Sequence, residues 1–84
     1  MVTSFELFHV IADASSARVR RYLVDHELGQ DVTLRNIHYP EANAAFVSHG
    51  GQQTPALWDG ERLHVGADAI IARLVAFSDV GRNG

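Results

Sequence analysis

The first 37 residues contain two strand-like segments separated by an amphipathic one, and this arrangement constrains the fold most. Residues 4–10 and 32–37 are rich in β-branched and aromatic side chains, which favours strands. Between them, side chains at helical spacing predict one buried stripe, formed by Val19, Tyr22, Leu23 and His26. A strand, a helix and a strand within about 30 residues predict a right-handed parallel βαβ unit.

Both ends of this first helix carry recognisable capping residues. Asp13, Ser15 and Ser16 are all favourable N-cap types, so we expect the helix to begin among them. Gly29 is well placed to end it in a left-handed cap.

The rest of the chain predicts a second helix and a hairpin. Pro40 suits the first turn of a helix that runs to about Ser48 and ends at the Gly50–Gly51 pair. Residues 53–58 and 62–65 are expected to be strands, joined by a turn at Asp59–Gly60.

A last helix is expected to open at Gly66 and Asp68. Its apolar positions again follow helical spacing: Ala67, Ile70, Ile71, Leu74 and Val75. The element order is therefore β-α-β-α-β-β-α, an α/β domain. We expect the domain to span residues 1–78, with 79–84 as a flexible C-terminal tail.

Composition excludes several function classes. The chain has no cysteine, which rules out a disulfide scaffold, a thiolate zinc site and dithiol or monothiol redox chemistry. A net charge of -3 gives no sign of a nucleic-acid partner. We expect no membrane partner and a cytoplasmic location, because no apolar run approaches about 20 residues and no signal peptide is apparent. The five histidines form no close pair, so no metal site is expected.

Three segments together resemble one protein superfamily. They are ADASSARVRRYL at 12–23, GGQQTPALWDGERL at 50–63 and VGADAIIARL at 65–74. The chain resembles the thioredoxin superfamily, in particular glutaredoxins and the N-terminal domain of glutathione transferases. The resemblance implies a four-stranded mixed sheet flanked by three helices. It also implies a cis Thr54–Pro55 bond that turns the Thr54 backbone toward the first helix, where it can pair with an extended peptide such as glutathione.

The chain departs from this family where the chemistry takes place. By alignment, the position of the family's nucleophile falls on Asp13, which cannot attack a disulfide and is better explained as an N-cap. Ser15 or Ser16 is a candidate catalytic residue that could activate a glutathione thiol, with helix capping as the alternative. At the last helix, Gly66 and Ala67 stand where transferases usually carry Glu-Ser.

Two further groups are candidate ligand contacts. The amides of Ala67 and Asp68 remain a potential anion site, with Asp68 as a capping residue the alternative. The arginines at 18, 20 and 21 are most simply a solvated helix face, although they could meet an acidic partner or a glutathione carboxylate.

The expected ligand contacts are therefore Asp13, Thr54, Pro55, Ala67 and Asp68. Three functions stay open. The first is a non-catalytic module that binds a glutathione-like peptide or a protein. The second is a glutathione-dependent enzyme acting through Ser15 or Ser16. The third is a structural or homodimerising unit without ligand. No cofactor is expected beyond glutathione as a ligand.

Overall fold

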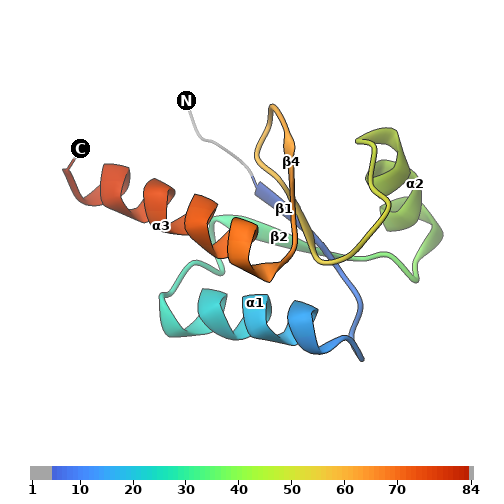
Figure 1. Cartoon of the computed structure of the whole chain (residues 1–84), viewed down its shortest axis with the longest axis horizontal. Coiled ribbons are helices and arrows are strands. Elements are labelled where there is room, and N and C mark those ends of the chain that lie inside the picture. The colour runs from blue at the N-terminus through green and yellow to red at the C-terminus, as the bar shows by residue number, and fades with distance from the viewer. Residues whose placement is uncertain (1–4, 84) are drawn as a thin grey trace.

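The computed structural model describes residues 5–83, so the expected strand start at Ser4 and the last tail residue, Gly84, lie outside the described residues. Seven elements follow one another along the chain: β1 (Phe5–His9), α1 (Ala14–Asp25), β2 (Val32–Asn36), α2 (Pro40–Ser48), β3 (Ala56–Trp58), β4 (Leu63–Val65) and α3 (Ala67–Asn83) (Figure 1). The predicted order of strands and helices is confirmed.

The strands form one mixed sheet in the order β2-β1-β3-β4. β1 runs parallel to β2, in a register that starts with Phe5 opposite Val32. β3 is antiparallel to both β1 and β4. The crossover from β1 to β2 is α1, as expected for a parallel pair.

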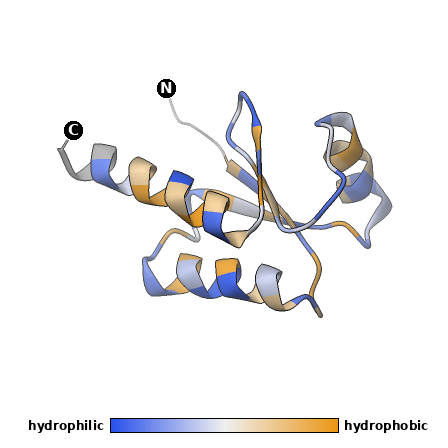
Figure 2. Cartoon of the chain, viewed as in Figure 1, coloured by the Kyte–Doolittle hydropathy of each residue, from blue (hydrophilic) through white to orange (hydrophobic). Residues whose placement is uncertain are grey.

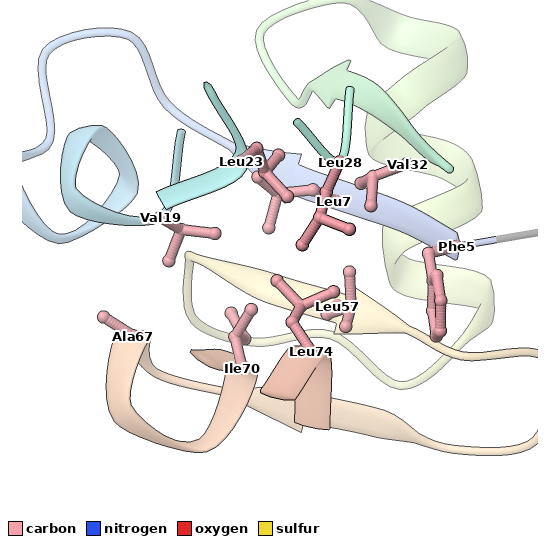
Figure 3. Close-up of a cluster of buried hydrophobic side chains, with 10 residues drawn as sticks. All are labelled: Phe5, Leu7, Val19, Leu23, Leu28, Val32, Leu57, Ala67, Ile70 and Leu74. Carbon is pink, nitrogen blue, oxygen red and sulfur yellow. The ribbon is translucent and has the colours of Figure 1, made fainter. Parts of the chain in front are cut away.

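The main core lies between the sheet and the helices α1 and α3, which lie side by side (Figure 1). Both helices are banded with hydrophobic and hydrophilic residues (Figure 2). The buried cluster between them and the sheet consists of Phe5, Leu7, Val19, Leu23, Leu28, Val32, Leu57, Ala67, Ile70 and Leu74 (Figure 3). Phe5 and Leu7 belong to the same face of β1 because side chains alternate along a strand.

The opposite face of the sheet carries a smaller cluster, in which Phe8 packs against Phe46 of α2 with ring centroids 5.5 Å apart. Gly51 makes this packing possible. A Cβ at Gly51 would clash with the ring of Phe46. The neighbouring Gly50 ends α2 with a φ of 86°, which confirms the predicted glycine stop.

The end of α1 differs from the sequence prediction. The helix ends at Asp25, and the residue in the left-handed region is Glu27, with a φ of 55°, rather than Gly29. The Leu28 amide donates to the Leu23 carbonyl at 2.8 Å, and both side chains are buried. The left-handed residue therefore lies two positions before the predicted Gly29. The burial of Leu28 in the core fixes where the chain turns after the helix. His26 is consequently exposed at the helix end, and the prediction that it is buried is wrong.

The turn between β3 and β4 and the end of helix α3 can also be compared with the sequence prediction. The Asp59–Gly60 turn is confirmed, with a φ of 101° at Gly60 and the Asp59 amide donating to the Arg62 carbonyl at 3.1 Å. Helix α3 continues through Asn83, so residues 79–83 extend the helix instead of following it as a tail. No proline interrupts this stretch, and each added residue contributes a further backbone hydrogen bond.

Candidate functional site

The residues singled out from sequence meet at one end of the sheet, where β1 ends and β3 begins. Phe8 pairs with Ala56, which brings the exit of β1 beside Pro55. Helix α3 starts at the same end, because the Gly66 amide donates to the Pro55 carbonyl at 2.9 Å. Helix α1 also begins there (Figure 1), and an ion pair between Arg18 and Asp68 at 2.8 Å joins it to the start of α3.

Asp13 caps the start of α1, as predicted. Its carboxylate accepts the Ser16 amide at 2.9 Å and the Ser16 hydroxyl at 2.8 Å. The hydrogen bond from the Ser16 hydroxyl, followed by that from the Ser16 amide, lowers the pKa of Asp13 below its ordinary value. The negative charge that a helix N-terminus favours is thus already supplied by the chain itself.

The two candidate catalytic serines have different environments. Ser16 is fully buried, and its hydroxyl also accepts the Val10 amide at 3.2 Å. Ser15 is exposed. The geometry therefore gives Ser16 a structural role between the end of β1 and the start of α1, and leaves Ser15 as the serine that a ligand can reach.

Thr54 and Pro55 precede β3 directly. The peptide bond between them is cis, as the resemblance implied. Pro55 is buried and Thr54 half-buried. Neither the N–H nor the C=O of Thr54 has a hydrogen-bond partner within residues 5–83. This leaves an unpaired backbone edge where a further extended segment can bind.

Asp68 does not cap the start of α3, contrary to the capping interpretation from the sequence. The side chain of Asp68 is 90% exposed and points to Arg18 instead of capping the helix. Gly66, with a φ of 92°, accepts the Ile70 amide through its carbonyl at 3.0 Å. The amides of Ala67 and Asp68 have no partner among the residues that the structure describes. Because Arg18 offsets the charge of Asp68, an anion near these amides meets less repulsion.

Arg20 is a residue whose role the sequence analysis missed. Its guanidinium bonds Nδ1 of His9 at 3.0 Å, the Val10 carbonyl at 3.2 Å and the Ile11 carbonyl at 3.0 Å. Burial, followed by the charge of Arg20, lowers the pKa of His9 below its ordinary value. The arginine thus holds the segment between β1 and α1. Of the three arginines expected on a solvated face, Arg18 and Arg21 fit, with side chains 57% and 83% exposed, whereas Arg20 is half-buried.

Other histidines also have specific partners. His49 stacks on Trp58 with centroids 3.8 Å apart. His64 Nε2 bonds the Asp59 carboxylate at 2.8 Å, and Arg73 bonds the same carboxylate at 3.2 Å. His9 is buried, with 4% of its surface exposed, and the side chain of His64 is 18% exposed.

Surface hollows lie away from the predicted site. One lies between α1 and α3 and includes Tyr22 and Val75. Another follows β2 into α2 and includes Leu34 and Tyr39. No group of side chains that could hold a metal ion occurs among the described residues. None of the helices in the described part of the chain is long and apolar enough to cross a membrane.

Comparisons with known proteins found no protein-family model, no curated protein and no solved structure that matches this chain.

Proposed function

We propose that the chain is a cysteine-free, thioredoxin-like domain, similar to glutaredoxins and to the N-terminal domain of glutathione transferases, that binds a glutathione-like peptide without catalysing a reaction on it. Three features support this assignment. They are the element order, the strand order β2-β1-β3-β4 and the cis peptide bond directly before β3. All three agree with the layout that the resemblance implies.

The observation that carries the proposal is the unpaired backbone of Thr54. An extended peptide adds to a sheet through main-chain hydrogen bonds, which require a free N–H and a free C=O on the receiving strand. Thr54 offers both, two residues before Ala56, which pairs with Phe8 near the end of β1. Because the contact uses backbone atoms alone, the missing cysteine does not remove it.

The amides at the start of α3 supply the second half of the proposed contact. A peptide that lies along Thr54 reaches the start of α3, since Gly66 bonds Pro55. There, a carboxylate of the peptide can accept the amides of Ala67 and Asp68. The pairing of Asp68 with Arg18 favours this contact by reducing the negative charge at that point.

Catalysis is not part of the proposal. The chain has no thiol, and the Ser16 hydroxyl is buried between Asp13 and the Val10 amide. A hydroxyl that activates a bound thiol must lie within hydrogen-bond reach of it. Ser15 is the remaining candidate. A binding role alone predicts that the chain does not turn over a model electrophile with glutathione, and turnover that Ser15→Ala abolishes would contradict it.

The experiment is a titration of the isotope-labelled chain with reduced glutathione, followed by NMR. We expect saturable shifts at millimolar concentrations, centred on Thr54 and Ala67. Arg18→Gln should weaken binding, because it leaves the Asp68 carboxylate unpaired near the ligand. Arg21→Gln removes the same charge from an exposed position and should leave binding unchanged. Absence of shifts, or equal effects of the two variants, would contradict the proposal.

A further inference from the structure

The outer edge of β2 is a second feature with consequences for binding. β2 ends the sheet and pairs with β1 on one side. The Phe5 amide donates to the Asp31 carbonyl at 3.4 Å, and the Ile37 amide donates to the His9 carbonyl at 3.1 Å. Odd-numbered residues of this segment therefore direct their backbone groups toward β1. By alternation, Val32 and Leu34 direct theirs outward.

This edge lacks the usual protection against pairing with another strand. Natural edge strands are commonly shielded by lysine, proline or a bulge. β2 reads VTLRN, and its register with β1 is continuous over five residue pairs. Leu34 at its centre is 49% exposed. By the same alternation, the backbone N–H and C=O of Val32 and Leu34 do not bond β1, and no turn or loop of the described residues bonds them from the outer side.

We propose that β2 pairs with β2 of a second copy of this chain, antiparallel and about a two-fold axis at Thr33, which joins the two sheets into one. In this register Val32 lies opposite the partner's Leu34, and the two residues exchange the outward backbone hydrogen bonds. Thr33 then faces its own symmetry mate at a site where side chains approach most closely. Two threonines opposite each other form a favourable cross-strand pair.

Charge complementarity selects this register. It places Asp31 opposite the partner's Arg35, twice in the symmetric pair. Asp31 makes no ion pair within residues 5–83. Arg35 binds Glu6 at 2.6 Å through one terminal nitrogen, and its other N–H groups can donate to a second carboxylate. A two-fold axis at Leu34 would remove both pairs of Asp31 with Arg35. An axis at Arg35 would place Arg35 opposite the same arginine of the second copy, where the two positive charges repel each other.

The first test is sedimentation of the full chain over a range of concentrations. We expect a reversible equilibrium between the monomer, of 9.2 kDa, and a dimer. Leu34→Pro should give a folded monomer, because the Leu34 amide does not bond β1 and proline is tolerated at a solvent-facing edge position. Circular dichroism establishes that this variant is folded. A wild-type chain that stays monomeric at all concentrations would overturn the proposal.

A charge variant tests the register. Asp31→Arg should raise the dimer dissociation constant by about tenfold or more, because both cross-strand pairs become repulsive. Glu61→Arg makes the same change in charge at the exposed hairpin turn and should leave the constant unchanged. Equal effects of the two variants would show that net charge, and not the Asp31 contact, governs association.

Single cysteines locate the axis, since the natural chain contributes no thiol. Under mild oxidation, Thr33→Cys should yield a disulfide-linked dimer, because the two copies of position 33 face each other within disulfide reach. Leu34→Cys should not, because its symmetry mate lies diagonally across the interface. Efficient cross-linking through position 34 but not 33 would contradict this register, as would equal cross-linking through the exposed control Ala44→Cys.

Discussion

The carboxylate of Asp13 holds Ser16 by two hydrogen bonds, one from the amide at 2.9 Å and one from the hydroxyl at 2.8 Å. Because the same hydroxyl accepts the Val10 amide, one serine joins the end of β1 to the start of α1. We predict that Ser16→Ala destabilises the fold by about 1–3 kcal/mol, since it leaves a backbone amide unpaired. Urea unfolding measures the loss. Ser15→Ala is the control and should change stability by less than about 0.5 kcal/mol.

Arg20 should be equally important for the segment after β1. Arg20→Met removes three hydrogen bonds and should cost about 1–3 kcal/mol in the free energy of unfolding. The pKa of His9 should rise, because burial continues to lower it but the nearby positive charge is gone. NMR titration of the histidine ring measures this change. If Arg21→Met raises the His9 pKa as much as Arg20→Met does, the contact with Arg20 is not what lowers the pKa of His9.

Asp59 makes stability depend on pH. Burial alone would raise its pKa, but hydrogen bonds from His64, from the amides of Arg62 and Glu61 and from Arg73 outweigh it, so the pKa lies well below the ordinary value. The stabilisation is therefore complete above the unfolded-state pKa of about 3.9 and is lost as pH falls through the lower folded-state value.

Asp59→Asn should consequently destabilise the chain by about 1–3 kcal/mol near neutral pH. The difference from wild type should shrink below about pH 4. Chemical unfolding at a series of pH values tests both statements. Asp25→Asn, at a position whose side chain is 59% exposed, should show little effect. A difference that stays constant down to acid pH would refute the role assigned to Asp59.

The left-handed residue at the end of α1 offers a stabilising substitution. Glu27 adopts a φ of 55° without the freedom of glycine. Glu27→Gly should therefore stabilise the chain by about 1 kcal/mol. Gly29 has an ordinary φ and no atom within 4 Å of an added Cβ, so Gly29→Ala should be neutral or stabilising. Thermal melts in which Gly29→Ala is the damaging change would contradict this view.

Much of the fold could be predicted from the sequence because each element carries a local signal. The aromatic and β-branched content of β1, the capping type at Asp13 and the Asp59–Gly60 turn act over a few residues. The end of α1 could not be predicted from such local signals. The burial of Leu28 in the core fixes where the helix stops, and a tertiary contact outweighed the local preference for Gly29.

The candidate site was predictable only in part for a similar reason. Thr54 and Pro55 stand in a recognisable segment, and their cis bond was expected. The contacts of Arg20 with His9 and of Arg18 with Asp68 join residues on different elements. No spacing within one element indicates such a pair. Their positions follow from the packing of α1 against α3 and against the end of β1.

The exchange rate of the Thr54 amide hydrogen tests the proposed function most directly. This amide is unpaired in the free chain, so its exchange with solvent should slow when reduced glutathione binds and a main-chain hydrogen bond forms. We predict a saturable slowing at Thr54 that follows the NMR shifts, with no change at the exposed turn residue Glu61. Glutathione-induced shifts without any slowing at Thr54 would contradict pairing with this backbone edge.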